Sequence, residues 1–440
     1  MTQRLLNFTV ESTDERLTPR AGEAVFGEFL KAIGVDRLCH KYLPLPQSNH
    51  GYHPYVYIQP LLLMLHSGGR YLEDIRMIAS DKALCTLLGI KSVPVADSIG
   101  KWLKRSTQKK AEGMEKINRI LLERYLSKIE EEPLILDIDA TVIESHKSIA
   151  RTTYKMFPGF TPILGHINGG YVIHQEFRAG NVAPADHNLT FVQQCEAQLP
   201  KRRKIDYLRA DAASYQAALF NYCDKNDITY VIGGHLDQSV LASIQNITEW
   251  KPLKTKEGTA HHLKEEVAEF IHTMNSTDHA FRLIVVKKTA TPILHGLEQF
   301  LSQEEQRAYA SQRYSVIATN DTTMTPEELV HFYRQRGDTS ENRIKELKNG
   351  FNLKYLPTSH FKANALYFHI GTLAYNLFIL FKQILHHSWQ KHTIQTIRYK
   401  LYHIAGKVIT HARQMILKVN EPFVEILHTI RQKNYEISLE

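Results

Sequence analysis

A short apolar run that ends in two acidic residues is the feature that most constrains how this chain folds. The run extends from Leu134 to Ile138, with Asp137 inside it and Asp139 directly after it. Such a β-branched, apolar segment predicts a buried central strand of an α/β domain. In open α/β sheets, ligands and metals bind at the carboxyl ends of these strands. Asp137 and Asp139 are two residues apart, so a regular strand directs both to one face. The alternative is one solvated acid and one acid satisfied by a turn.

Strand and helix patterns alternate after this run. The predicted strands are Tyr171–Phe177, Ile205–Ala210 and Ile228–Gly233, and helices are predicted at 190–198 and in the segment that ends at Cys223. This alternation predicts a sheet with helices packed against it. The pattern loosens over 236–320, where 281–286 and 314–318 are strand candidates. We interpret that stretch as an insertion into the sheet domain.

A basic helix is predicted near the end of the helical N-terminal region. A helix that ends near Leu88 is followed by a turn at Gly89–Pro94 and by a new helix with Asp97 as its N-cap. The second helix carries Lys101, Lys104 and Arg105 among its basic residues. This order is typical of a helix-turn-helix, whose second helix lies in the DNA major groove. The alternative is an ordinary helical hairpin with a solvated basic face.

Length and charge agree with a DNA-binding protein of several domains. The chain has 440 residues, enough for two or three domains. Lys+Arg 54 against Asp+Glu 46 gives a net charge of +8, which suits a polyanionic partner. We expect five regions. They are a helical DNA-binding region at 1–130, a core begun at 131–235, an insertion subdomain at 236–320, a core helix at 321–360 and a C-terminal helical region at 361–440.

The cysteines and the apolar runs indicate a cytoplasmic protein. Four scattered cysteines form no CxxC pair, which argues against a zinc site or a disulfide framework and favours a reducing compartment. The N-terminus has no basic start followed by an apolar core, so no signal peptide is expected. Polar residues interrupt the apolar run 365–385, which therefore predicts a buried helix and no membrane span.

Three acidic residues occupy positions where folding can bring side chains together. Asp139 ends the first strand, Asp211 ends a later one, and Glu341 opens a helix after the insertion. Three carboxylates suit hard divalent cations. Two such ions can clamp the attacking and leaving oxygens of an in-line phosphoryl displacement. The chain has no Walker loop, Rossmann glycine fingerprint or HExxH motif, which argues against nucleotide hydrolysis, hydride transfer and zinc proteolysis.

The helix of the third acid also carries cations. Glu341, Lys345 and Lys348 are spaced i, i+4 and i+7, so one helical face carries all three. A carboxylate with two cations beside it fits a metal ion next to a DNA phosphate. The alternative is a surface helix with Glu–Lys pairs, which contribute little free energy.

These stretches together resemble the DDE transposases of bacterial insertion sequences, which have the retroviral-integrase-like RNase H fold. The likeness is greatest to the group whose third acid lies in a tyrosine–arginine–glutamate–lysine signature. The stretches that carry the resemblance are Leu136–Thr141, Phe177–Asn181, Leu208–Asp211 and Tyr333–Lys348, together with Gly68–Asp74 and Leu87–Pro94 in the helical front half. The resemblance therefore covers most of the chain. It implies an α/β, RNase H-like catalytic core with an insertion subdomain, flanked by helical N-terminal and C-terminal regions.

The resemblance assigns roles to single residues. Asp139 matches the first metal-binding acid, with Asp137 as the alternative, Asp211 matches the second and Glu341 the third. The signature positions that contact DNA phosphates in the family fall on Tyr333, Arg336 and Lys348. One departure is that four residues, instead of the family's three, separate Arg336 from Glu341. We expect a bulge at 337–340 to hold the extra residue. Trp250 is the available match to a tryptophan that stacks on a flipped base in relatives.

The function that the resemblance implies is cut-and-paste DNA transposition. Two Mg²⁺ ions, for which Mn²⁺ can substitute, would serve phosphodiester hydrolysis and then strand transfer. The partners would be double-stranded DNA, at the element's inverted repeats and at the target, and a second copy of the chain that pairs the two ends. The alternatives are a nuclease without strand transfer and a DNA-binding regulator derived from a transposase.

Overall fold

The computed structural model describes residues 6, 8–46, 51–129, 131–253, 263–290 and 313–439. Parts of the expected insertion, 254–262 and 291–312, lie outside these residues. The chain divides into two compact units: unit 1 comprises Met1–Ile117 and Glu346–Glu440, and unit 2 comprises Asn118–Lys345. Unit 1 is therefore built from both ends of the chain. Helix α7 (Gln108–Leu126) crosses the division.

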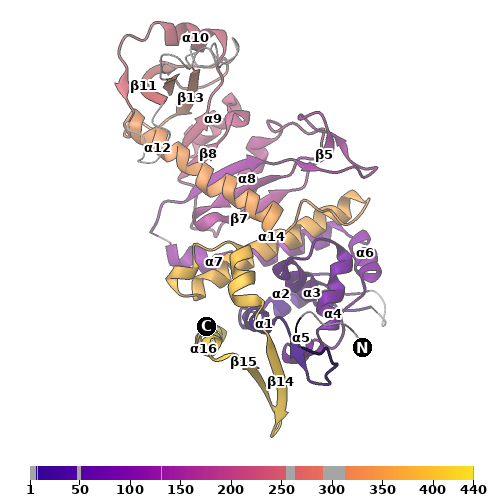
Figure 1. Cartoon of the computed structure of the whole chain (residues 1–440). Coiled ribbons are helices and arrows are strands. Elements are labelled where there is room, and N and C mark those ends of the chain that lie inside the picture. Colours follow the sequence, from indigo (N-terminus) through magenta and orange to yellow (C-terminus); the bar gives the residue numbers. More distant parts are fainter. Residues whose placement is uncertain are drawn as a thin grey trace. The chain divides into compact units, whose positions relative to one another are not determined.

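Unit 2 is built on a mixed sheet, which has nine strands within the described residues (Figure 1). Its order is β10-β11-β12-β13-β9-β8-β2-β6-β7. The strands are β2 (Ile135–Ala140), β6 (Ile163–Ile167), β7 (Tyr171–Glu176), β8 (Tyr207–Ala210), β9 (Thr229–Gly233), β10 (Lys251–Pro252), β11 (Leu263–His272), β12 (Phe281–Ala290) and β13 (Arg313–Thr319). β2, β8 and β9 run parallel, and the other pairings are antiparallel.

The expected insertion extends the core sheet. β13 pairs with β9, and β12, β11 and β10 follow outward, so the 236–320 stretch contributes strands to the same sheet. A smaller sheet of β3 (Ile143–Glu144), β4 (Arg151–Thr152) and β5 (Pro158–Phe160) follows β2. The helices of unit 2 are α8 (Asn188–Ala197), α9 (Ala217–Lys225), α10 (Gln238–Gln245), α12 (Pro326–Arg336) and α13 (Asn342–Lys345). A π-helical turn, η6 (Gly337–Glu341), joins α12 to α13.

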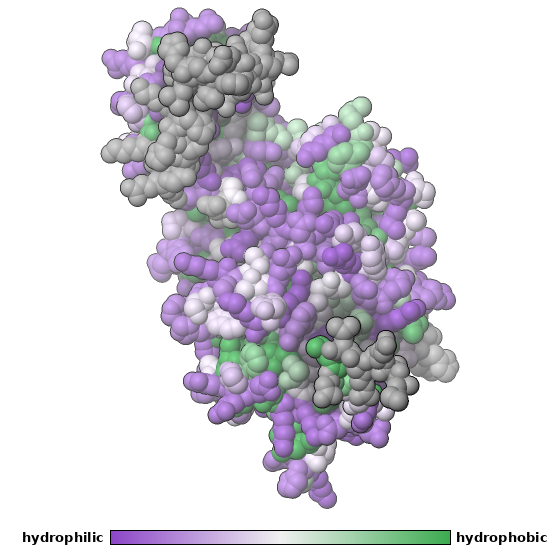
Figure 2. Space-filling view, in the orientation of Figure 1, coloured by the Kyte–Doolittle hydropathy of each residue, from purple (hydrophilic) through white to green (hydrophobic). Residues whose placement is uncertain are grey.

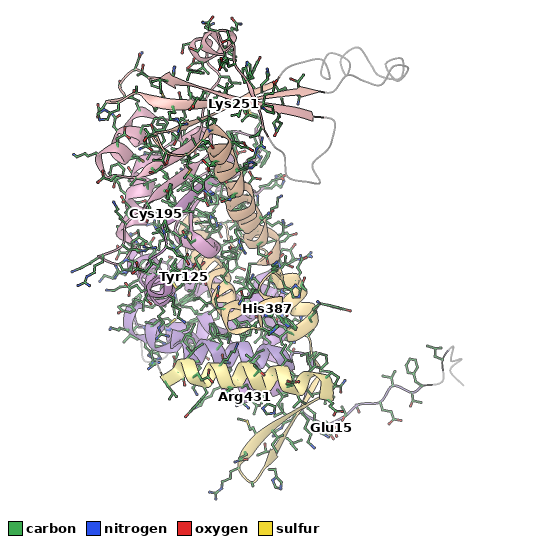
Figure 3. All side chains as sticks on the ribbon, turned by 90° about the vertical axis from the view of Figure 1, so that its left-hand side faces the viewer. Glu15, Tyr125, Cys195, Lys251, His387 and Arg431 are labelled. Carbon is green, nitrogen blue, oxygen red and sulfur yellow. The ribbon has the colours of Figure 1, made fainter. Side chains whose placement is uncertain are left out.

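Alternation along β2 sends its apolar and acidic side chains to opposite faces of the sheet. Leu136 and Ile138 are fully or almost fully buried. On that face β6 carries Gly165, where an added Cβ would lie 2.6 Å from Cys195 Sγ of α8 (labelled in Figure 3). This close approach packs α8 under the apolar side of β2. Asp137 and Asp139 therefore lie on the other face, toward α12.

Helix α12 begins with a strong local signal and packs on the sheet's second face. Thr325 and Glu328 form a capping box, and Pro326 occupies the first turn. Leu329 and Val330 are buried in a cluster with residues of β9, β11, β12 and β13. The helix therefore lies across the strands that the insertion adds.

Unit 1 is mainly helical. Its helices besides α7 are α1 (Ala21–Ala32), α2 (Val35–Tyr42), α3 (Pro54–Ser67), α4 (Ile75–Ser80), α5 (Lys82–Leu87), α6 (Ala96–Lys104), α14 (Phe361–Ile384), α15 (Ile394–Ile397) and α16 (Val424–Leu439). α14 is long and apolar enough to cross a membrane, but 83% of its most apolar window is buried within the protein. It is thus packed as a core helix, as the polar residues in its sequence indicate.

Several helix boundaries in unit 1 differ from the sequence expectation. Asp81 interrupts the helix predicted over 71–88, because its side chain accepts a hydrogen bond from Leu84 N and caps α5. The basic helix α6 begins at Ala96, so Asp97 lies in the first turn and is not the N-cap; it pairs with Lys101 at 2.7 Å. α6 ends at Lys104.

The C-terminal region is not purely helical, contrary to expectation. β14 (Gly406–His411) and β15 (Gln414–Val419) form a hairpin that pairs with β1 (Leu17–Thr18) and projects from unit 1 (Figure 1). The turn residues Ala412 and Arg413 both have positive φ, the geometry that a tight hairpin turn requires. Apolar side chains are visible in the same part of unit 1 (Figure 2), where Met415 and Ile416 are half exposed.

Substitution of Gly180 is expected to destabilise unit 2. An alanine Cβ there would lie 2.3 Å from the carbonyl oxygen of Arg151 and 2.4 Å from that of Gly159. Because backbone cannot move aside cheaply, Gly180→Ala should lower the free energy of unfolding by about 1–3 kcal/mol in urea titrations. Gly337→Ala is the matched control, since none of the described atoms outside its own helix lies within 4 Å of its added Cβ. Equal stability of the two variants would contradict the packing at Gly180.

A buried glutamate in unit 1 predicts a dependence of stability on pH. Burial raises the pKa of Glu23 from 4.5 to about 7, against smaller opposing effects of a hydrogen bond from Ser67 and the charge of Arg20. The folded chain therefore binds this proton more tightly than the unfolded chain does, and stability falls as pH rises from 4.5 to 7. Glu23→Gln should reduce the difference between urea midpoints measured at about pH 5 and about pH 8. An unchanged difference would show that Glu23 is not its source.

Candidate functional site

Asp137 is committed to a buried ion pair. Arg209 of β8 donates from Nε to Asp137 Oδ1 at 2.7 Å and from Nη2 to Oδ2 at 2.8 Å. The same guanidinium donates from Nη1 to the carbonyl oxygen of Phe332 at 2.7 Å and lies over the Phe332 ring. Both charged side chains are at least 95% buried. Asp137 therefore fastens β2 to β8 and, through Arg209, to α12.

Asp139 has a different environment on the same face. Its Oδ1 lies 3.3 Å from Nη2 of Arg336, at the last turn of α12. The pKa of Asp139 is raised to about 6, chiefly by burial; the positive charge of Arg336 opposes the rise, and the negative charges of Asp211, Glu341 and Asp137 add to it. The three acids singled out in the sequence are thus electrostatic neighbours. The difference between Asp137 and Asp139 lies in which arginine each one meets.

Asp211 reaches the site because β8 is parallel to β2. Ile138 pairs in register with Ala210, and each is followed directly by an acid, Asp139 and Asp211. Parallel strands end at the same sheet edge, so both carboxyl groups emerge there. Asp211 Oδ1 accepts a hydrogen bond from Ala213 N at 3.1 Å, which fixes the turn after the strand. The side chain is half-buried.

Glu341 is carried by the π-helical turn. The sequence predicted a bulge at 337–340, and the structure has the π-helical turn η6 there, which continues α12 into α13 without a break. Ser340 is fully buried inside this continuous helix. A π turn takes in one more residue than an α turn and keeps the helical hydrogen bonds. It therefore holds the extra residue between Arg336 and Glu341 in the segment where a bulge was expected.

Tyr333 joins the same cluster from α12. A Cβ on Gly233, at the end of β9, would lie 2.7 Å from the Tyr333 hydroxyl oxygen, so the ring reaches the carboxyl end of the parallel strands. Burial raises the pKa of Tyr333, Arg336 lowers it, and Asp211, Asp139 and Glu341 raise it further. An aromatic hydroxyl and a guanidinium thus accompany the three acids.

The remaining predicted site residues lie elsewhere or at the margin. Lys345 is exposed on α13, one turn after Glu341. Lys348 lies in a second π-helical turn, η7 (Glu346–Gly350), which belongs to unit 1. Lys101, Lys104 and Arg105 lie on the exposed face and at the C-terminus of α6, also in unit 1.

Trp250 is not brought to the acids. Its ring contacts Lys287 Nζ at 4.1 Å from the centroid and lies 6.1 Å from the ring of Tyr314. Lys287 belongs to β12, and β13, β9 and β8 separate that strand from β2. The tryptophan is thus half-buried beside the outer strands of the sheet.

Two residues of the site were missed in the sequence. Arg209 had a signal, since a charged residue inside the apolar stretch Leu208–Ala210 needs a buried partner. Tyr154 lies in the turn between β4 and β5 and is 52% exposed. Its pKa is raised by burial and by the charges of Asp139 and Asp211, which places the phenol in the electrostatic field of the acids. No local pattern relates Tyr154 to them.

The carboxyl groups of Asp139, Asp211 and Glu341 are the kind of ligands that suit a divalent cation, but their positions in this structure do not form a ready site for one. Carboxylate oxygens are the ligands that hard divalent cations prefer. Within the residues that the structure describes, however, no group of three His, Cys, Asp or Glu side chains is close enough to hold an ion. A guanidinium lies against Asp139 instead.

Comparisons with known proteins point to one family. A family model described as "Transposase DDE domain group 1" matches residues 3–433. Among solved structures, a piggyBac transposase synaptic complex with hairpin DNA is similar at 11% sequence identity, with 87% of this chain and 79% of that chain covered and a TM-score of 0.43. A TM-score this low does not establish a shared fold. No protein with a curated description matches the chain.

The two acids of β2 are expected to differ in their effect on stability. Asp137→Asn leaves Arg209 buried without a counter-charge and should lower the free energy of unfolding by about 3–5 kcal/mol. Asp139→Asn should lower it by less, because the contact of Asp139 with Arg336 is longer, at 3.3 Å, and burial already raises the pKa of this acid. Urea denaturation near neutral pH measures both. Comparable losses in the two variants would contradict this division of roles.

Proposed function

Since the chain belongs to the transposase DDE domain group 1 family, and is therefore a transposase, we propose that it cuts DNA at the ends of its own mobile element and joins those ends to a new site. The observation that carries the proposal is the cluster of Asp139, Asp211 and Glu341 where β2 and β8 end, with Arg336 and Tyr333 beside it. Three acids at one sheet edge, next to cationic groups, suit a phosphodiester substrate.

We propose that the core of unit 2 is RNase H-like. In support, the part of the sheet in the order β7-β6-β2-β8-β9 is a meander of antiparallel strands followed by two parallel ones. The first two acids then follow neighbouring parallel strands, and the third follows the helix that packs across them. The insertion strands β10–β13 extend the sheet on the side of β9.

The residues have distinct proposed roles. DDE transposases generally use divalent metal ions, and here Asp139, Asp211 and Glu341 would hold them; we propose two Mg²⁺ ions, for which Mn²⁺ can substitute. Such ions, when bound, activate water and stabilise charge on a phosphoryl group. Arg336, Tyr333 and Lys345 would contact the DNA phosphates near the cut. Asp137 has a structural role and stays with Arg209.

The bond changes need no nucleophile from the protein. Water attacks the phosphorus at the element's end, and the bond to the 3′ oxygen breaks, which frees a 3′-hydroxyl. That hydroxyl then attacks a phosphodiester of the target DNA, and a new bond forms as the target strand breaks. The protein's own groups orient the backbone and neutralise its charge. No covalent enzyme intermediate forms.

The partners follow from this activity. The exposed basic face of α6, with Lys101, Lys104 and Arg105, would bind the terminal inverted repeats. A homodimer would hold the two ends together, and we place the protein in the bacterial cytoplasm as an insertion-sequence product. The net charge of +8 supports a DNA partner.

Removal of the second acid is expected to separate binding from cutting. Asp211→Ala should abolish cleavage of a supercoiled plasmid that carries the DNA flanking the gene, because no ligand replaces the carboxylate. A gel shift should show unchanged binding to the same DNA, since α6 is untouched. EDTA should stop cleavage by the wild type to the same extent. A fully active Asp211→Ala variant would reject the assignment of this acid.

The same assay separates the proposed function from its alternatives. Excision followed by joining supports a transposase that completes both steps. Nicking without joining supports a nuclease without strand transfer, and a gel shift with no cleavage under any metal condition supports a regulator. The matched control is Asp186→Ala, because Asp186 is exposed and its hydrogen bonds among the described residues are with Ala183 and Arg178. Its cleavage and binding should equal those of the wild type.

A further inference from the structure

Arg336 lies where a cation would otherwise balance Asp139. Its Nη2 is 3.3 Å from Asp139 Oδ1, and the side chains are only 8% and 14% exposed. In this position the guanidinium offsets charge that Asp211 and Glu341 make unfavourable. The described residues form no ready site for a metal ion, although the acids for one are present. One explanation accounts both for the contact between Arg336 and Asp139 and for the lack of a ready metal site among the described residues.

We infer that Arg336 is a resident counter-ion that competes with the divalent cation for Asp139, and that DNA phosphate draws it away. This inference rests on the proposed function. An ion that bound Asp139 now would lie beside the positive guanidinium of Arg336, and two cations this close together in a buried site repel each other. Metal binding without DNA is therefore penalised. A DNA phosphate gives Arg336 a new anionic partner and removes that penalty.

The π-helical turn gives the site a means to rearrange. It separates Arg336 from Glu341 and packs against β2. Two fully buried polar groups near it, Ser340 Oγ and the His166 ring, have no hydrogen-bond partner within the described structure. Such unsatisfied groups cost free energy. The free-energy cost of these unsatisfied groups makes the present form of the turn less stable. The turn is therefore a suitable place for Arg336 and Glu341 to change position together.

The competition makes metal and DNA binding mutually dependent. If DNA strengthens metal binding by some factor, metal must strengthen DNA binding by the same factor. Coupling of this kind is commonly about 5- to 150-fold. The transposase would thus assemble its cation site mainly when DNA is present, which limits hydrolysis in the absence of a correctly bound end.

Mn²⁺ binding to the full-length protein without DNA tests the inference directly. Free Mn²⁺ is measured by electron paramagnetic resonance for the wild type, Arg336→Gln and Arg334→Gln. Arg334 is the matched control, because it lies on the same helix and pairs with Glu265, away from the acids. Arg336→Gln should bind Mn²⁺ about 5- to 150-fold more tightly than the wild type, and Arg334→Gln should not differ from it. Equal or weaker binding by a folded Arg336→Gln would overturn the inference, as would no binding by either protein.

Asp139→Asn distinguishes failure of this inference from failure of the proposed function. If Asp139→Asn still binds Mn²⁺ as the wild type does, the acid is not a ligand and both ideas fall. If it loses Mn²⁺ binding while Arg336→Gln shows no gain, only the role of Arg336 falls. In a second arm, duplex DNA from the gene's flanks should tighten Mn²⁺ binding to the wild type but not to Arg336→Gln. Equal tightening of both would also overturn the inference. Thermal melts confirm that each variant is folded.

Discussion

The buried pair of Asp137 and Arg209 is the interaction on which the arrangement of the site depends. It joins the two neighbouring strands that precede the first two acids, and the third hydrogen bond of Arg209 reaches the backbone of α12 at Phe332. One guanidinium therefore sets the spacing between two strand ends and the helix that carries Tyr333 and Arg336. A bidentate arginine suits this task because its donors are held in a rigid plane. Asp139, two residues further along β2, lies outside this pair and contacts Arg336.

The helix of the third acid shows how one extra residue can be accommodated without a break in the helix. One added residue in an α-helix would rotate every later side chain away from its place. The π turn takes in one more residue than an α turn, and Glu341 still contributes to the electrostatic environment of Asp139 and Tyr333. Single π turns are frequent at functional sites. Here the turn also lies between Arg336, whose guanidinium contacts Asp139, and Glu341, the third acid.

The sequence predicted the site in part because its determinants are local. The apolar run before Asp139, the strand before Asp211 and the helical spacing of Glu341 and Lys345 each carry a pattern that needs no knowledge of the rest. The strands β6 and β11 were missed, since Gly165 and His166 interrupt the first, and charged residues alternate through the second. Asp137 and Asp139 differ in their ion pairs, the first with Arg209 and the second with Arg336. Both arginines lie far along the chain, so no local pattern predicts which acid pairs with which arginine. The stacking role expected for Trp250 likewise depends on tertiary placement.

The division of unit 1 between the two ends of the chain has a consequence during synthesis. α1 packs against α16, where Asn434 donates to the carbonyl oxygen of Val25, and Arg398 donates to that of Leu65 in α3. These partners leave the ribosome after the strands of unit 2. A nascent chain can therefore bury the core of its N-terminal helices only after α16 is made, by which time the described strands of unit 2 have already been synthesised. A prematurely terminated product would contain the three acids but would lack a finished support for α6.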